Sequence, residues 1–380
     1  MSDGTTFIET RKSYRQGAVT LPGRYYTAPE IFADEAERIF GRSWLCVGRE
    51  EEIGLTGEYF LVSAAGESLI VARDEGGAAH ALYNVCRHRG TRLREEERGR
   101  LRSIQCPYHA WTYGLDGRLI GAPEMDGVEG FDRADYPLHR ANLASWGGFL
   151  FVNLAEEPEP FQEAFGPLLD RFTRFNMTRL RAWRRIEYEV KANWKLVFQN
   201  YSECLHCPVI HARLSELTPF RTGQNDLVEG PFLGGYMVLA EKGGSMTMSG
   251  RSCARPVGEL PEEEFERVYY YSIFPNLLLS LHADYVMAHR VWPQASDRTR
   301  IVCEWLFHPE ASGAPGFDPD DAIRFWDMTN HEDWGICELA QAGISSRKYT
   351  PGPYSPRESL PAAWDREYLR RMTGAVQPRK

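Results

Sequence analysis

Four residues in the first half of the chain are spaced as two metal-ligating pairs. Cys86 and His88 form a C-x-H pair, and after seventeen intervening residues Cys106 and His109 form a C-x2-H pair. Each pair follows a segment with β-strand character, so each is predicted to lie in a short loop. Two such loops, each offering one thiolate and one imidazole, can close around a single inorganic centre. Structural zinc sites more often use pairs of like residues, and zinc is the competing interpretation.

The residue pattern around these pairs predicts two domains and a leading arm. A chain of 380 residues is longer than one core usually organises. Residues 44–155 contain short β-rich runs, such as EYFLVSA and SLIVAR, separated by glycine and charged turns, which predicts a small all-β domain. Residues 156–380 mix strand runs such as YYYSIF with helices predicted near 160–176, 193–207 and 319–341, which indicates an α+β domain. Residues 1–43 are predicted to form an arm, with a helix over 29–40, that packs on this second domain.

Charge and hydropathy exclude several partners. The formal net charge is −9 and the pI is near 5.7, so a nucleic acid or an anionic membrane, which needs a basic patch, is not expected as a partner. No apolar run is long enough for a signal peptide or a transmembrane helix, and we expect a cytoplasmic protein. Because the cytoplasm keeps thiols reduced, the eight cysteines are not expected to form disulfides.

The two ligand loops resemble those of a known family. NVCRHRGTRL and CPYHAWTYGLDGRL are similar to the ligand loops of Rieske domains in ring-hydroxylating oxygenases. In a Rieske [2Fe-2S] cluster two thiolates hold one iron and two imidazoles hold the other, which raises the reduction potential. The resemblance therefore implies Cys86, His88, Cys106 and His109 as cluster ligands. The neighbouring Arg87, Tyr108 and Trp111 are candidates for shielding the cluster.

A second group of candidate ligands lies about a hundred residues later, in NWKLVFQNYSECLHCPVIH. Glu203 and His206 are three residues apart, so they are predicted to share one face of a helix, and Pro208 is expected to disturb that helix before His211. Two histidines and one carboxylate form the facial triad of non-haem Fe(II) oxygenases, which leaves positions open for dioxygen and substrate.

This segment resembles the iron-binding motif of Rieske oxygenase α subunits. The resemblance implies His206 and His211 as iron ligands, with Glu203 as a non-ligand that bridges His206 to the partner subunit's His109. A glutamate here, in place of the usual aspartate, is similar to the branch that acts on quaternary ammonium compounds. The later segment MTNHEDWGICELAQAG resembles the family's late helix and implies Asp333 as the third ligand. Asp327, Glu332 and Glu338 are the alternatives to Asp333.

Residues beside the motif are candidates for the catalytic machinery and the substrate pocket. Asn200 is a second candidate catalytic residue next to Glu203, and the predicted pocket residues are Gln199, Leu205, Cys207 and Val209. Cys204 and Cys207 have C-x2-C spacing, but they are expected on one helix as core or pocket residues. The chain's 18 Tyr and 10 Trp residues could supply an aromatic cage for a trimethylammonium group, although 269–271 are expected to be core.

The resemblance implies an N-terminal all-β Rieske domain and a C-terminal helix-grip domain, an antiparallel sheet with helices. It also implies a homotrimer, or an α-subunit trimer capped by β subunits. Electrons would come from NAD(P)H through a separate flavin-containing reductase, with or without a ferredoxin, because no G-x-G-x-x-G follows a strand here. The leading hypothesis is an oxygenase that hydroxylates or demethylates a small molecule, and Glu203 favours a quaternary amine. The alternatives are an aromatic-ring dioxygenase and an electron carrier without oxygen chemistry, and an intact triad argues against the carrier.

Overall fold

The computed structural model describes residues 6–374, which divide into two compact units. One unit contains residues 36–166, and the other contains residues 6–35 together with 167–374. The first five residues of the predicted arm lie outside the described residues. The α+β class, with an all-β N-terminal unit and an antiparallel sheet with helices in the other, is confirmed.

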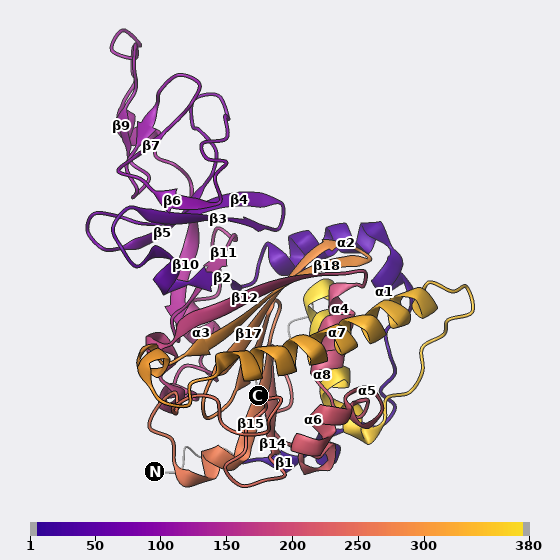
Figure 1. Cartoon of the computed structure of the whole chain (residues 1–380). Helices are drawn as coiled ribbons and strands as arrows, with labels where there is room; N and C mark the ends of the chain where they lie inside the picture. The colour runs from indigo at the N-terminus through magenta and orange to yellow at the C-terminus, as the bar shows by residue number, and fades with distance from the viewer. Residues whose placement is uncertain (1–5, 375–380) are drawn as a thin grey trace. The chain divides into compact units, whose positions relative to one another are not determined.

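The unit of residues 36–166 is built from antiparallel strands. A seven-stranded sheet has the order β2-β11-β10-β5-β4-β3-β6 (Figure 1). Its strands are β2 (Leu45–Arg49), β3 (Glu58–Ala64), β4 (Glu67–Arg73), β5 (Ala79–Tyr83), β6 (Arg98–Arg100), β10 (Arg140–Trp146) and β11 (Phe149–Asn153). The short hairpin between β3 and β4 turns at Ala65 and Gly66, both with positive φ, as a two-residue hairpin turn requires.

The same unit also contains a small three-stranded sheet. It contains β7 (Ile104–Gln105), β8 (Thr112–Tyr113) and β9 (Leu119–Gly121). Cys86, Cys106 and Trp111 are buried in one apolar cluster with Ile104 and Tyr113. The two predicted cluster-ligand loops therefore belong to a single packed core.

The boundaries of this unit differ from the predicted 44 and 155 for a packing reason. The chain enters through the π turn Ala36–Phe40, where Ile39 and Phe40 are buried. At the other end the indole nitrogen of Trp44 donates to the Glu159 carbonyl at 2.9 Å, and the Phe161 ring stacks on Phe165. Residues up to 166 are therefore held in the β unit by aromatic contacts that the proline-rich sequence did not indicate.

The other unit contains an eight-stranded antiparallel sheet with the order β1-β13-β14-β15-β16-β17-β18-β12. The strands are β1 (Ile8–Glu9), β12 (Arg181–Val190), β13 (Gln224–Leu227), β14 (Phe232–Val238), β15 (Arg267–Ile273), β16 (Leu277–Leu281), β17 (Val286–Ala295) and β18 (Arg298–Phe307). All five residues of β16 are buried, as expected for a central strand with near-continuous apolar sequence.

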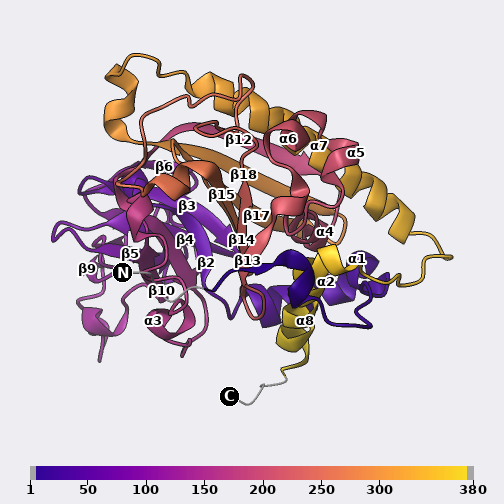
Figure 2. The same ribbon diagram turned by 90° about the horizontal axis from the view of Figure 1, so that it is seen from below.

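Helix α7 (Pro319–Ile344) crosses this sheet, and α4 (Trp194–Tyr201) packs against it (Figures 1 and 2). Two contacts fix α7 to the strands: Asn330 bonds to His289 of β17 at 3.1 Å, and Asp327 accepts from the Tyr188 hydroxyl of β12 at 2.7 Å. The predicted late helix is therefore one continuous element that presents a single face to the sheet.

The shorter helices differ from their predicted extents. The helix predicted over 160–176 is only α3 (Phe161–Ala164), followed by turns, and the helix predicted over 193–207 ends at Tyr201. The remaining helices are α1 (Arg24–Thr27), α2 (Pro29–Glu35), α5 (Cys207–Ile210), α6 (Ala212–Leu217) and α8 (Ser359–Thr373).

A buried polar cluster ties the N-terminal segment to the rest of the second unit, which contains residues 6–35 and 167–374. Glu35 of α2 accepts from the Lys195 ammonium at 2.5 Å, the Trp194 indole at 2.7 Å and the Tyr368 hydroxyl at 2.6 Å. A buried carboxylate is tolerated because three donors replace its water. Within residues 6–374, no helix has the length and apolar character needed to cross a bilayer.

Candidate functional site

The two predicted cluster loops have the same backbone conformation. The amide of Cys86 donates to the Thr91 carbonyl at 2.8 Å, and the amide of Gly90 donates back to Cys86 at 3.0 Å. The second loop repeats the pattern, with Cys106 donating to Trp111 at 2.8 Å and Ala110 donating to Cys106 at 3.1 Å. The fifth residue of each loop, Gly90 or Ala110, has positive φ. The two loops therefore share one hydrogen-bonded frame around their cysteines, with the histidine third in one loop and fourth in the other.

The side chains of these loops suit an iron–sulfur cluster. Cys86 and Cys106 are free and buried, and the rings of His88 and His109 lie 4.8 Å apart. The Nδ1 atom of His109 is buried and has no hydrogen-bond partner among the described residues. An imidazole nitrogen without water or protein partner is costly unless a metal uses it. The donor set of two thiolates and two imidazoles is the one that a Rieske cluster requires.

Tyr113 is a cluster neighbour that the sequence did not single out. Its hydroxyl accepts from the Arg87 amide at 3.0 Å and lies 3.3 Å from the Cys86 sulfur, so its proton can point at that sulfur. Trp111 stacks on the His88 ring at 4.8 Å and is buried, whereas Tyr108 packs on His109 but is 56% exposed. Hydrogen bonds to cluster sulfurs raise the reduction potential.

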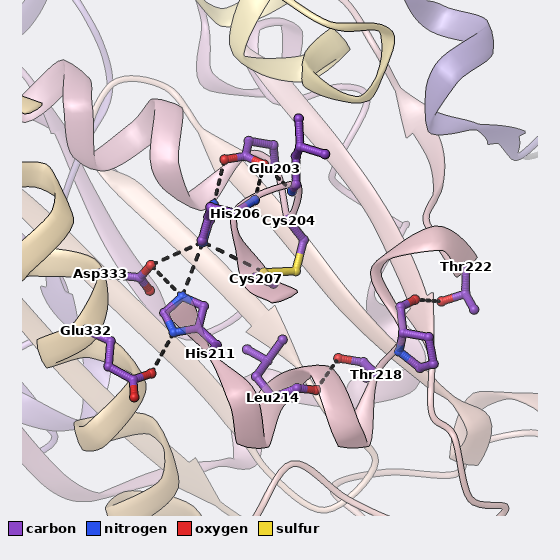
Figure 3. The surroundings of a disulfide bond; sticks show 12 residues. Glu203, Cys204, His206, Cys207, His211, Leu214, Thr218, Thr222, Glu332 and Asp333 are labelled. Carbon is purple, nitrogen blue, oxygen red and sulfur yellow. Dashed lines mark hydrogen bonds and ion pairs between the residues drawn. A yellow bond between two sulfur atoms is a disulfide. The ribbon is translucent and has the colours of Figure 1, made fainter. Parts of the chain in front are cut away.

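The predicted iron ligands converge in the second unit (Figure 3). The Nε2 atoms of His206 and His211 lie 3.2 Å apart, and Asp333 Oδ1 lies 2.9 Å from His211 Nε2 and 3.4 Å from His206 Nε2. Ligands about 2.1 Å from a metal lie about 3 Å apart on an octahedral face. Two imidazoles and one carboxylate in this arrangement fit a mononuclear Fe(II) ion.

The outer nitrogen of each histidine is held by a glutamate. Glu203 Oε1 lies 2.6 Å from His206 Nδ1, and Glu332 Oε2 lies 2.7 Å from His211 Nδ1. Each carboxylate favours a proton on Nδ1, which leaves Nε2 as the metal donor. Burial lowers the pKa of His206, but the hydrogen bonds to Asp333 and Glu203 outweigh it and raise the pKa to about 10. A metal cation at this point would replace that proton.

Among the acidic residues of α7, Asp333 alone reaches both histidine Nε2 atoms. Glu332 contacts the opposite side of the His211 ring, Asp327 accepts from Tyr188, and Glu338 accepts from the Lys191 amide at 2.9 Å. This placement favours Asp333 over the three alternatives considered from the sequence.

The predicted helix through Glu203 and His206 is wrong. Helix α4 ends at Tyr201, and both residues lie in the following turn before α5 begins at Cys207. Glu203 Oε2 stabilises the turn by accepting from the amides of Leu205 and His206. Pro208 does not disturb a helix but occupies its first turn, where its missing N–H costs nothing.

Cys204 and Cys207 form a disulfide across this turn (Figure 3), so the expectation that no cysteine is oxidised is wrong for this pair. The thiols of Cys86, Cys106, Cys253, Cys303 and Cys337 are free. The sulfur of Cys207 lies 3.8 Å from His206 Nε2, but a disulfide sulfur is not a thiolate ligand. The disulfide closes the loop that carries His206.

The predicted iron ligands line a cavity in the second unit. Three of the predicted neighbours line it: Asn200, Leu205 and Cys207. Gln199 and Val209 lie elsewhere. The Gln199 amide donates to the Tyr26 hydroxyl and to Asp365, which turns it into the core, and Val209 is 85% exposed. Sequence proximity to a ligand therefore did not determine which side chains face the cavity.

Aromatic residues from distant segments also line the cavity, including Tyr201, Tyr270 and Trp326. Tyr269 and Tyr271 are buried core residues on β15, as expected, but Tyr270 points the other way. Strand alternation could have separated Tyr270 from its neighbours, although it could not have assigned its face to a cavity.

Two family models cover most of the chain. The Rieske [2Fe-2S] domain matches residues 43–132, and the catalytic domain of the ring hydroxylating alpha subunit matches residues 177–374. These matches overturn the zinc and electron-carrier alternatives, because the chain carries both domains.

Two of the relatives match along nearly the whole chain. The glycine betaine monooxygenase oxygenase subunit of Chromohalobacter salexigens is 33% identical, covering 90% of this chain and 83% of that protein. The subunit of the same name from Pseudomonas aeruginosa is 30% identical, covering 90% and 86%. A carnitine monooxygenase oxygenase subunit from Acinetobacter baumannii is 34% identical over 51% of this chain and 53% of its own length.

Solved structures show the same fold. A quaternary ammonium Rieske monooxygenase in complex with L-carnitine superposes with a TM-score of 0.76 at 24% identity, covering 93% of this chain and 95% of that one. A naphthalene 1,2-dioxygenase from Rhodococcus sp. gives 0.74 at 20% identity, covering 94% and 95%. With its Rieske domain, its catalytic domain and full-length relatives of the same organisation, the chain belongs to the Rieske non-haem iron oxygenases as a catalytic α-type subunit.

Proposed function

We propose that this oxygenase demethylates a small quaternary amine by hydroxylating one N-methyl group. The observation that carries the proposal is the cavity. His206, His211 and Asp333 line it together with three aromatic residues, Tyr201, Tyr270 and Trp326. Aromatic faces attract a trimethylammonium group, which has no N–H to donate. The names of the two full-length relatives point to the same substrate class.

The proposed reaction balances with dioxygen and two electrons. One oxygen atom of O2 enters a methyl C–H bond to give a hydroxymethyl ammonium, and the other leaves as water with the two electrons and two protons. The C–N bond of the hydroxymethyl group then breaks, releasing formaldehyde, a proton and the tertiary amine. Bound iron supplies the activation of dioxygen, and the [2Fe-2S] cluster supplies the electrons singly.

The protein's own residues orient this chemistry. Glu203 and Glu332 keep the outer imidazole protons in place, so that both Nε2 atoms face the cavity. The indole N–H of Trp326 is tied to the Tyr285 hydroxyl at 2.7 Å, which fixes the ring as a wall. A rigid, largely apolar wall excludes water and holds the methyl group beside the metal position.

The electron route remains part of the proposal. We infer that electrons come from NAD(P)H through a separate flavin-containing reductase, directly or through a ferredoxin, since the relatives are named as oxygenase subunits. In a homotrimer Glu203 would bridge His206 to the partner subunit's His109. The exposed Tyr108 beside His109 supports this, because it places that ligand near the surface of its unit. A cytoplasmic location also remains a prediction.

The test is substrate-dependent turnover of the iron-loaded protein with a flavin reductase and NADH. Glycine betaine, carnitine and choline are compared with a set of aromatic acids, and formaldehyde is measured against the demethylated amine. We expect both products in a one-to-one ratio from at least one amine, and none from Asp333→Ala, which lacks the carboxylate ligand. Diols from the aromatic acids, with no formaldehyde from any amine, would overturn the proposal.

A further inference from the structure

The substrate cavity has two chemically different ends. Near the iron ligands its wall is aromatic: the Tyr201 and Tyr270 rings lie 6.1 Å apart, and the Tyr270 and Trp326 rings lie 6.3 Å apart. Trp326 and Asp333 are seven residues apart on α7, so they lie on one face of that helix, two turns apart. The aromatic wall reaches the metal site through Tyr201, which lies two residues before Glu203, the partner of His206.

The second end carries unused hydrogen-bond donors. Asn225 of β13 lines the cavity and is only 5% exposed, yet its amide nitrogen has no hydrogen-bond partner among the described residues. Arg357 lines the same cavity, with its guanidinium 5.2 Å from the centre of the Phe220 ring. Within residues 6–374, no carboxylate forms an ion pair with Arg357. The buried Asn225 amide is costly without an acceptor, and a ligand oxygen would satisfy it. Arg357 is partly buried.

The sheet register separates the two ends. Asn225 is paired with Gly235 of β14, and Gly235 is paired with Tyr270 of β15. Asn225 and Tyr270 are thus two strands apart, which is roughly 10 Å along the sheet between their backbones. Both side chains project from the same face of the sheet, so a small, extended molecule could contact one of them at each end.

The charged residues of the cavity are also divided between its two ends. Apart from the two ligand histidines, Arg357 is the single cationic side chain among the described residues that line the cavity, and the acidic residues there are Glu203 and Asp333. With Fe(II) bound, these two carboxylates offset its two positive charges, so the metal end does not repel a cation. The Arg357 end favours an anion.

We propose that Arg357 and Asn225 bind a carboxylate, and that the substrate is therefore a betaine, with its trimethylammonium group at the aromatic metal end. This inference rests on the proposed function, because the ammonium group must sit where a methyl is oxidised. A guanidinium and a carboxamide N–H are matched donors for one carboxylate, and charge-assisted bonds of this kind are the strong ones. Arg357 and Asn225 are specificity-determining residues that distinguish a betaine from choline.

The chain provides a matched control for Arg357. Arg221 also lies over the Phe220 ring, 5.5 Å from its centre, but it does not line the cavity. If the role of Arg357 were only to pack on Phe220, removing either arginine would have the same effect. A difference between the two variants therefore isolates the cavity-facing role.

The experiment measures binding by calorimetry, without turnover, on the metal-loaded protein. Glycine betaine is compared with its methyl ester, which lacks the negative charge, and with choline. We expect the wild type to bind glycine betaine at least tenfold more tightly than the ester. Arg357→Met is expected to weaken glycine betaine binding roughly 10- to 100-fold and ester binding less than about twofold. Arg221→Met should change neither.

A second variant covers the case in which Arg357→Met does not fold. Asn225→Asp keeps the shape of the side chain and places a negative charge beside the carboxylate, so it should weaken glycine betaine binding about tenfold or more and spare choline. Circular dichroism melting checks that each variant is folded. If betaine, ester and choline bind the wild type equally well, the carboxylate site is refuted while the proposed function stands. If no trimethylammonium compound binds, the proposed function itself fails.

Discussion

Replacing Glu332 with glutamine should weaken iron binding without removing a ligand. Glu332 Oε2 lies 2.7 Å from His211 Nδ1, on the side of the ring away from Asp333. The carboxylate keeps a proton on Nδ1 and makes Nε2 a better donor. Glutamine can still accept the hydrogen bond through its amide oxygen, so the substitution removes mainly the negative charge.

The magnitude follows from the exposure of the pair. A hydrogen bond to a charged group contributes about 1.5–3 kcal/mol, but the Glu332 side chain is 35% exposed while His211 is 2% exposed. Solvent screening places the loss near the lower limit, about 1.5–2 kcal/mol. At about 1.4 kcal/mol per decade, the Kd for Fe(II) should rise roughly 10- to 30-fold.

The assay is an anaerobic titration of the iron-depleted mononuclear site with Fe(II), in competition with a chelator. Glu338→Gln is the matched control, because Glu338 lies on the same helix but accepts from the Lys191 amide, away from the histidines. The control should shift the Kd by less than about twofold. An unchanged Kd in Glu332→Gln would refute the argument that this carboxylate tunes the His211 nitrogen.

Three further predictions test other parts of the structure. Glu203→Gln should retain iron and cluster but slow substrate oxidation at least about tenfold, measured as single turnover of the pre-reduced enzyme, and an unaltered rate would remove Glu203 from the electron route. Burial raises the pKa of Asp365 to about 7, so the folded state binds more protons than the unfolded state between about pH 4 and 7. The free energy of unfolding should therefore fall by up to about 4 kcal/mol as pH rises through that window. Denaturant unfolding of Asp365→Asn should show a free energy that depends less on pH. A Cβ on Gly235 would lie 1.9 Å from a backbone oxygen of β13, so Gly235→Ala should lower the free energy of unfolding by at least about 3 kcal/mol. In Gly335→Ala of α7 the Cβ meets no atom within 4 Å, so this variant should be neutral or stabilise by up to about 1 kcal/mol. Similar melting temperatures for the two glycine variants would contradict this.

Local spacing predicted those candidate ligands that are close in sequence. Cys86 with His88, and Cys106 with His109, lie in tight loops whose geometry depends on few residues, and the structure gives both loops the same hydrogen bonds. The strand run YYYSIF of the second unit was also identified, as part of the largely buried β15, whereas β13 and β14 were not predicted.

Helix ends and side-chain orientations could not be predicted from local sequence in the same way. The helix predicted through Glu203 ends at Tyr201, because the Glu203 carboxylate caps the turn and the Cys204–Cys207 disulfide closes it. Gln199 was expected to face the pocket, yet it bonds to Asp365 far away in the sequence. Such contacts override local propensity.

The sequence by itself determined the family and predicted the two kinds of iron site, since candidate ligands that share a loop leave their spacing in the chain. Only the tertiary structure decided that Asp333 meets His211 across 122 residues and that Arg357 and Asn225 line the same cavity. These contacts depend on the strand register and on the packing of α7, which place residues from separate segments together. Substrate recognition depends on such long-range packing, and no local sequence spacing records it.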